Sequence, residues 1–217
     1  MKAIKTCPES AWDRINKRVH EEVGEGYHIA PMNQERKEMI RKATDEFTEA
    51  VMTNTPVCSE KLFETDGVPV MVTDIAMRMN GIFNDEACIF IGLDCMGEIA
   101  ININSHTKEI MTEREIKALV AHELGHKDAP AITEAQKYEI NRIIVDELGY
   151  LPLFWVSMPI EGEFQADDET INQGYGEELI SALEKTLRSA REDFLILIGY
   201  STIKRIDRIK KILAERR

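Results

Sequence analysis

Two histidines and a glutamate lie close together in the middle of the chain, where residues 121–126 read Ala-His-Glu-Leu-Gly-His. On a helix, His122 and His126 are about one turn apart and project from the same face. Two imidazoles placed in this way can both reach one Zn²⁺ at about 2.0–2.1 Å. Glu123 is close enough to contact a water on that metal, where a general base is needed. The pattern predicts His122 and His126 as metal ligands and Glu123 as the catalytic residue.

A catalytic zinc site also needs a third protein ligand and a group that orients the ligand histidines. The acidic segment 161–168 offers carboxylates at helical spacing. If Glu163 binds the metal, Asp167 lies one turn further on and can accept a hydrogen bond from the far ring nitrogen of a ligand histidine. Gly125 costs a helix up to about 1 kcal/mol relative to alanine, so we expect another part of the chain to approach the backbone closely there.

These residues must be positioned by a mixed set of helices and strands. The apolar and β-branched runs predict strands at residues 68–73, 87–91 and 98–104, with a hairpin turn at 94–97. Capping residues predict three helices, which run from Asn33 to about Met52, onward from Thr112 with Glu115, and from Thr133 with Gln136 to Gly149.

The C-terminal part reads as mostly helical. One apolar stripe consists of Leu179, Leu183, Leu187, Ala190 and Phe194, and a second of Ile203, Ile206, Ile209 and Leu213. The order of helix, small sheet and further helices predicts an α+β fold. We expect a helical N-terminal region of unknown role at residues 1–65 and the site-bearing domain at residues 66–217.

Composition excludes some classes of function. The 217 residues carry a formal net charge of −12, and such a surface repels phosphate backbones, so we expect no nucleic-acid partner. No run approaches the roughly 20 apolar residues of a transmembrane helix, and the apolar runs 150–160 and 194–200 read as buried core. The N-terminus has no secretory signal, and the four cysteines form no C-x-x-C pair, which favours reduced thiols in a cytoplasmic protein.

The segment from Thr112 to His126 resembles the active-site helix of the gluzincin metallopeptidases that include the CAAX prenyl proteases and the heat-shock protease HtpX. Residues 163–167 (Glu-Phe-Gln-Ala-Asp) are similar to the family element E-[FY]-x-A-D. The resemblance, which covers roughly residues 68–213, implies a zincin-like fold in a trimmed form without membrane helices. It also implies Glu163 as the third zinc ligand and Asp167 as the residue that supports a ligand histidine.

The expected activity is therefore that of a zinc metalloendopeptidase, which hydrolyses peptide bonds of a peptide or protein substrate with a metal-activated water. The ImmA/IrrE-type peptidases are a second family that fits the core motifs. A catalytically silent zinc-binding module that acts as a protein-interaction partner is the main alternative function, and a zinc hydrolase with a non-peptide substrate is another.

Three further expectations concern the surroundings of the site. The donor that assists at the developing oxyanion stays open among Tyr150, Tyr175, His106 and Arg205. By analogy with the resembled family, the strand at residues 98–104 is expected to form the sheet edge to which a peptide adds. The basic residues of the C-terminus are expected to form one solvated helix face, and they are Lys204, Arg205, Arg208, Lys210, Lys211, Arg216 and Arg217.

Overall fold

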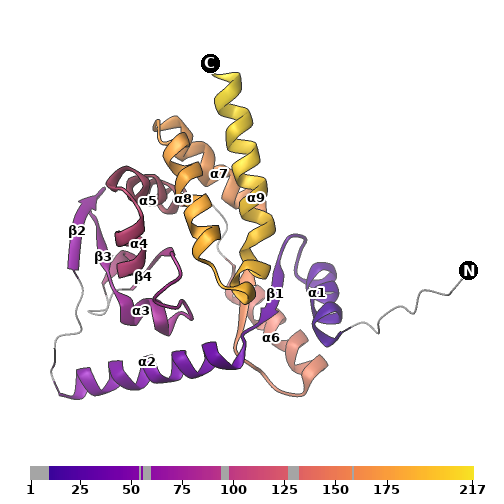
Figure 1. Cartoon of the computed structure of the whole chain (residues 1–217). Helices are drawn as coiled ribbons and strands as arrows, with labels where there is room; N and C mark the ends of the chain where they lie inside the picture. Colours follow the sequence, from indigo (N-terminus) through magenta and orange to yellow (C-terminus); the bar gives the residue numbers. More distant parts are fainter. Residues whose placement is uncertain (1–9, 54, 56–59, 94–97, 127–131, 158) are drawn as a thin grey trace, which may run out of the picture. The chain divides into compact units, whose positions relative to one another are not determined.

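The computed structural model describes residues 10–53, 55, 60–93, 98–126, 132–157 and 159–217 (Figure 1). Contacts divide the chain into two compact units, each described by itself below. Unit 1 consists of residues 1–32 and 130–160, and unit 2 of residues 33–129 and 161–217. This division does not follow the boundary expected after residue 65, because the strands on its two sides pair with each other in unit 2. The separate role expected for residues 1–65 stays a prediction.

Unit 1 is built from two helices and two strands. Its elements are α1 (Ala11–Glu22), β1 (His28–Pro31), α6 (Glu134–Leu148) and β6 (Phe154–Ser157). The strands pair antiparallel, and the core contains only isoleucine and valine among its fully buried residues, namely Ile15, Val19, Ile29, Ile140, Ile143 and Ile144. α1 falls within the N-terminal region expected to be helical, but its bounds were not predicted, although Ser10 and Asp13 form a capping box at its start.

The α6 helix confirms its predicted ends. The side chain of Thr133 caps the first turn together with Gln136, and Gly149 ends the helix in the left-handed conformation at φ 78°. The expectation of a buried run after Gly149 is wrong in part. Tyr150, Leu151 and Leu153 are about half exposed or more, because they precede β6 in a segment without regular structure.

Unit 2 contains a four-stranded mixed sheet in the order β2–β3–β5–β4. The strands are β2 (Glu60–Thr65), β3 (Val68–Val72), β4 (Ile89–Leu93) and β5 (Ile99–Ile103). β3 and β5 are parallel, whereas the two outer pairs are antiparallel. Two short helices follow inner strands, α3 (Asp74–Met79) after β3 and α4 (Ser105–Ile110) after β5. The predicted turn at residues 94–97 lies outside the described residues.

The expectation of a sheet edge at residues 98–104 is wrong. β5 is an inner strand, with Asn102 opposite Met71 of β3 on one side and opposite Phe90 of β4 on the other. Asn102 is fully buried and accepts a hydrogen bond from Thr73 Oγ1 at 3.0 Å. The edge role was expected by analogy with the resembled family, but the side-chain amides of Asn102 and Asn104 are hydrogen-bonded inside the protein. Among the described strands, β4 and β2 are the edges.

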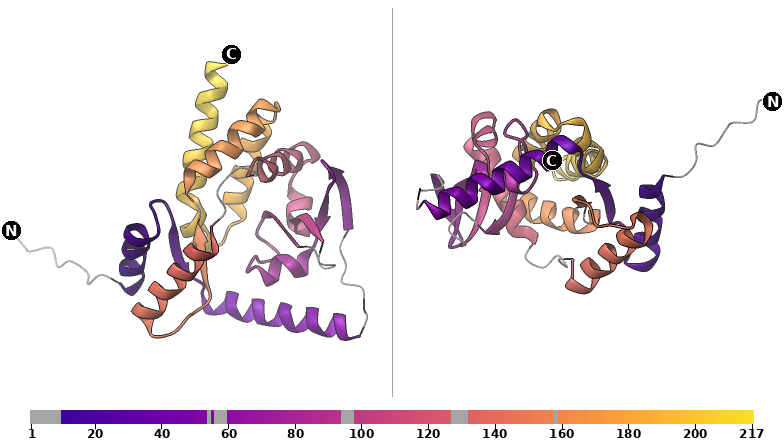
Figure 2. Two further views of the ribbon diagram at one scale, coloured as in Figure 1. Left: turned by 180° about the vertical axis from the view of Figure 1, so that it is seen from behind. Right: turned by 90° about the horizontal axis from the view of Figure 1, so that it is seen from below.

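The remaining helices of unit 2 are α2 (Gln34–Met52), α5 (Glu113–Gly125), α7 (Ile160–Asn172), α8 (Gly176–Ser189) and α9 (Glu192–Glu215). Apolar residues of the sheet, α5, α8 and α9 share one core, and α8 and α9 lie side by side in both views of Figure 2. The expected α+β class, with a small mixed sheet on the motif-bearing helix and a mostly helical C-terminal part, is confirmed. Within the described residues, no helix combines the length and apolar character needed to cross a bilayer.

The first C-terminal stripe is interrupted. Ala190 is the C-cap of α8, and α9 begins two residues later, so Leu179 to Leu187 and Phe194 belong to different helices. The run at 194–200 is only partly core, because Phe194 and Leu197 are buried while Ile196 and Tyr200 are exposed on the other side of α9.

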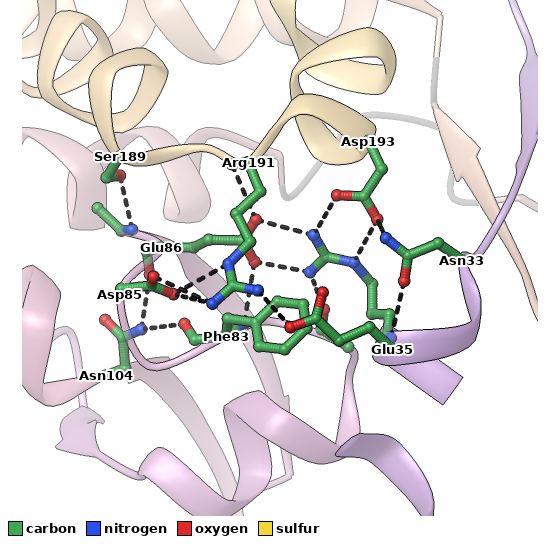
Figure 3. Close-up of polar contacts among 12 residues, drawn as sticks. Asn33, Glu35, Phe83, Asp85, Glu86, Asn104, Ser189, Arg191 and Asp193 are labelled. Atoms are coloured by element: carbon green, nitrogen blue, oxygen red, sulfur yellow. Dashed lines mark hydrogen bonds and ion pairs between the residues drawn. The ribbon is translucent and has the colours of Figure 1, made fainter. Parts of the chain in front are cut away.

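A buried ion-pair network joins three segments of unit 2 (Figure 3). Arg36, which has no exposed surface, pairs with Glu86 at 2.6 and 2.8 Å and with Asp193 at 2.8 and 2.9 Å. It also donates to the carbonyl of Gly81. Arg191 packs over the Phe83 ring at 3.7 Å and donates to Asp85 at 3.1 Å. The network fixes the N-terminal end of α9 against α2 and against the segment that leads into β4.

Glu115 connects the start of α5 to α8. Its carboxylate accepts hydrogen bonds from the Thr112 backbone at 2.6 Å, from Ser181 Oγ at 2.5 Å and from Lys185 Nζ at 2.7 Å. Burial by itself raises the pKa of this carboxyl, but the hydrogen bonds from Lys185, Ser181 and Thr112 outweigh burial and lower the pKa from 4.5 to about 2. Glu115 is therefore ionised in the folded chain well below the pH at which it protonates in the unfolded chain.

Replacement of Glu115 should flatten the acid side of the stability profile. Since the folded pKa is the lower one, the carboxylate stabilises the fold fully above about pH 5 and progressively less as the pH falls from 4.5 to about 2. We expect Glu115→Gln to lower the free energy of unfolding at pH 7 by about 3 kcal/mol, measured by urea denaturation. Glu113→Gln on the same first turn is the control and should change little, because Glu113 is exposed. Equal effects of both substitutions would contradict this role of Glu115.

Loss of the buried guanidinium should be costly because it leaves a carboxylate without its partner. We expect Arg36→Met to lower the free energy of unfolding by about 3–5 kcal/mol. The double variant Arg36→Met/Glu86→Gln should recover part of that loss, since it removes the unpaired charge. Additive effects of the two substitutions in denaturant titrations would show that the Arg36–Glu86 pair is not the stabilising contact.

Candidate metal centre

The two motif histidines lie at the C-terminal end of α5. The helix begins at the capping box of Thr112 and Glu115 and ends at Gly125, with His126 as its C-cap residue. The Nε2 atoms of His122 and His126 are 3.1 Å apart, and the rings meet edge to face with centroids at 4.7 Å. The spacing of one helical turn therefore places the two potential ligand atoms next to each other.

The acidic segment forms α7, which crosses α5 at its last residue. A Cβ atom on Gly125 would lie 2.9 Å from the Cα atom of Ala166 and 3.2 Å from its carbonyl oxygen. Only glycine permits this distance between the two backbones. The close approach expected at Gly125 is confirmed, and it brings the side of α7 that carries Glu163 and Asp167 next to His122.

Glu163 meets both histidines. Its Oε2 is 3.2 Å from Nε2 of His122, and its Oε1 is 3.6 Å from Nε2 of His126. Atoms bound to a tetrahedral zinc at about 2.0–2.1 Å are about 3.3–3.4 Å from one another. The separations of 3.1, 3.2 and 3.6 Å, the last two of which involve different oxygens of Glu163, lie around that spacing. The two imidazoles and the carboxylate are therefore placed so that they could hold one zinc ion.

Asp167 approaches the other side of the His122 ring. It is fully buried, and its Oδ1 is 2.9 Å from Nδ1 of His122. An Nδ1–H donated to this carboxylate leaves the Nε2 lone pair free to bind a metal. We call His122, His126, Glu163 and Asp167 the His–carboxylate cluster. The sequence predicted all four of its members, and the structure brings them together.

Arg205 of α9 lies against this cluster. Its Nη1 is 2.6 Å from Glu163 Oε2, and its Nε and Nη2 donate to the Asp167 carboxylate at 3.0 and 2.8 Å. Nη2 is 3.2 and 3.1 Å from Nδ1 and Nε2 of His122, and such similar distances place it against the ring rather than in line with one lone pair. The expected solvated face is therefore wrong for Arg205, which is buried.

The burial of Arg205 had a weak signal in the sequence. Thr202, Arg205, Ile206 and Ile209 follow one another at helical spacing and are all buried. The predicted stripe instead began at Ile203, which is 53% exposed. A shift of the stripe by one position would have placed Arg205 inside the protein.

Two carboxyl groups beside the histidines have opposite electrostatic environments. Burial, together with the nearby Glu163 charge, raises the pKa of Glu123 to about 7, although the charges of His122 and Arg205 oppose the shift. Burial also raises the pKa of Glu163, but the His122 hydrogen bond and the Arg205 charge outweigh it and lower that pKa to about 2. Neighbouring carboxyl groups with separated pKa values are suited to different roles. Glu163 is the ionised one, as a ligand must be, and Glu123 is suited to proton transfer.

Glu123 is also close enough to be a ligand, because one donor atom from each of His122, Glu123 and His126 lies within 4.8 Å of the others. Glu163 lies 3.2 and 3.6 Å from the two imidazoles and is ionised, which suits it to be the third ligand. Glu123 is held by a hydrogen bond to the backbone of Ile91 in β4. Among the described residues, no cysteine joins this group of potential ligands.

The four residues considered as hydrogen-bond donors to the developing oxyanion lie in different parts of the structure. Tyr150 belongs to unit 1, and Tyr175 precedes α8, where Arg114 stacks on its ring. His106 lies in α4 beside an open cavity lined also by Arg78 and Arg191. Of the four, Arg205 is the one with contacts to the His–carboxylate cluster.

Cys88, at the start of β4, is a free thiol, and burial raises its pKa to about 12. This agrees with the expectation of reduced cysteines for that residue, while Cys7, Cys58 and Cys95 lie outside the described residues.

Comparison with protein-family models, with curated proteins and with solved structures finds no match to this chain in any of the three.

The Gly125–Ala166 approach provides a test of the cluster geometry. We expect Gly125→Ala to push α7 away from α5 and to weaken zinc binding by about tenfold to a hundredfold, as loss of groups that support a metal ligand does. Zinc affinity can be measured by competition with a chromogenic chelator. Gly199→Ala is the matched control, because a Cβ at this helical glycine would meet its nearest neighbour at an ordinary 3.7 Å. Unchanged affinity in the Gly125 variant would mean that the helix crossing does not set the ligand geometry.

Proposed function

We propose that this chain is a zinc-dependent peptidase whose metal is bound by His122, His126 and Glu163. One observation carries the proposal, namely the convergence of two imidazoles and one carboxylate. The two Nε2 atoms are 3.1 Å apart, and the Glu163 carboxylate oxygens are 3.2 Å from His122 and 3.6 Å from His126. Two imidazoles and one carboxylate suit zinc and leave a fourth position for a water or a substrate. A closed structural site would favour thiolates as further ligands, and the described residues bring none to the cluster.

The roles of the surrounding residues follow from their contacts. Asp167 holds the His122 ring in the tautomer that directs Nε2 towards Glu163. Arg205 is a positioning residue, because its guanidinium bridges the carboxylates of Glu163 and Asp167 and keeps both ionised. Zinc, when bound, supplies a Lewis acid that polarises a water and the scissile carbonyl. Glu123 would act as the general base, accepting a proton from the attacking water as its oxygen bonds to the carbonyl carbon, and would deliver that proton to the amine as the C–N bond breaks.

The edge strand β4 supports a peptide as the substrate. β4 pairs antiparallel with β5 on one side only, and the backbone of Ile91, its central residue, is hydrogen-bonded to Glu123. An extended peptide that adds to the outer edge gains main-chain hydrogen bonds whatever its side chains are. This addition brings a peptide bond close to the proposed base. We therefore assign to β4 the peptide-binding role that was expected for β5.

Substitution of the proposed base and of a proposed ligand should have different effects. We expect Glu123→Gln to retain zinc and to lose turnover by about a hundredfold or more, because the ligands remain and the base is removed. His122→Ala should lose the metal as well. Metal content per chain, after purification without chelators, and cleavage of an unfolded protein are the two measurements.

The outcomes separate the competing functions. Less than one tightly bound zinc ion per wild-type chain would contradict the proposal. Bound zinc without cleavage of unfolded proteins or peptides would favour the catalytically silent binding module. Hydrolysis confined to a non-peptide ester or amide would keep the chemistry and change the substrate class.

A further inference from the structure

A large cavity lies in unit 2 between β2, α5 and α7. Its volume is about 690 Å³, within the range of roughly 300–1,000 Å³ that ligand-binding clefts occupy. Figure 1 shows β2 at the margin of the sheet beside α5. We call this cavity the β2 groove.

The β2 groove follows the edge of a strand. Phe63, Glu64 and Thr65 are successive residues of β2 and all line it, together with Asp66 of the following turn. Successive side chains of a strand point to opposite faces, so three in a row can border one cavity only along the strand's edge. No residue of β3 lines the groove. The groove therefore borders the edge of β2 that, among the described residues, pairs with no strand.

An unpaired edge offers main-chain hydrogen bonds to another extended chain. The length of such pairing is limited here, because the register between β2 and β3 shifts between Lys61 and Phe63. Bulges of this kind twist an edge and oppose long, unspecific sheet extension. The geometry suits a short extended segment opposite Phe63 to Thr65.

The charges around the groove are mainly negative. Glu64, Asp66 and Glu169 line it, against a single lining cation, Lys117. Glu64 forms an ion pair with Lys61 at 2.7 Å, so its charge is partly balanced. Lys117 is already paired with Glu113 at 2.6 Å. Glu169 is exposed, and among the described residues it takes part in no ion pair. Its carboxylate accepts only a long hydrogen bond of 3.4 Å from Gln173.

Three apolar residues of α5, Val120, Ala121 and Leu124, are among those that line the groove, and so is Phe63 of β2. Lysine and arginine side chains can bury their aliphatic stems against such residues and keep their charged ends outside. The surface that the groove exposes is more polar than apolar. The carboxylates therefore carry most of the preference for basic side chains.

The groove is separate from the His–carboxylate cluster. On α5, Ala121 and Gly125 face the groove, about 100° around the helix from His122 and His126. On α7, Gln165 and Glu169 share the groove side, about 200° around the helix from Glu163 and Asp167, and Gln173 follows the end of the helix. Two helices thus carry two sites on different faces.

We propose that the β2 groove binds an extended polypeptide segment rich in lysine or arginine, through the free edge of β2 and the carboxylate of Glu169. The site is independent of the proposed zinc chemistry. A segment with basic residues at alternate positions places them on one side, towards α5 and α7. It is an accessory docking site for a basic region of another protein.

The experiment uses the full chain and a fluorescent peptide in which lysine alternates with valine. Binding is followed by anisotropy in the presence of a chelator, so that hydrolysis does not interfere and the result does not depend on the proposed function. We expect Glu169→Lys to weaken binding by at least about tenfold. Glu215→Lys is the matched control, since it makes the same change in charge at an exposed position near the C-terminus of α9.

The control matters because an acidic chain attracts any basic peptide. Equal weakening by both substitutions would mean general charge attraction and would overturn the proposal. So would equal binding of a peptide in which glutamate replaces lysine. Hydrogen exchange provides an independent test of the binding mode. Protection of the amides at Phe63 to Thr65 on peptide binding supports strand addition, and protection confined to other segments contradicts it.

Discussion

The contact between Gly125 and Ala166 is the constraint on which the candidate site depends. Two helices approach there so closely that a single added carbon would lie 2.9 Å from backbone. α5 carries the histidines and α7 carries the carboxylates, and neither helix holds a complete ligand set. The absence of a side chain at one position in α5 lets donors 37 residues apart along the chain, His126 and Glu163, come within 3.6 Å.

The like charges brought together by this approach are balanced from a third helix. Asp167 is fully buried, whereas Glu163 and Glu123 are partly buried, and three such carboxyl groups without compensation would repel one another. Arg205 neutralises two of them and so lets the cluster exist in the folded chain. Because Arg205 is in α9, its position depends on the N-terminal end of that helix, which Arg36 ties to Glu86 and Asp193 (Figure 3). The guanidinium groups of Arg205 and Arg36, at the two ends of this series of contacts, both stay charged at any physiological pH.

The same pair of helices separates two surfaces of different character. One side presents imidazoles and partly buried carboxylates next to β4, and the other presents exposed carboxylates next to β2. Among the described strands, the two edges of the sheet thus lie beside different sites. Under the proposed function, this arrangement would let the chain hold a substrate protein at a region distant from the bond that it cuts.

The sequence by itself determined the local features, because each depends on neighbouring residues. Capping residues predicted the starts of α2, α5 and α6, and the spacing of His122, Glu123 and His126 predicted that these three side chains converge. Glu163 and Asp167 were added to them by the family resemblance. Strand order was decided only by the tertiary structure. The alternating pattern of β5 is the same for an inner strand as for an edge strand, since hydrogen-bonded amides such as Asn102 can be buried. The burial of Arg205 was also decided only by the tertiary structure. An arginine on a helix is expected to be exposed, and it is buried here because two carboxylates of another helix, Glu163 and Asp167, pair with it.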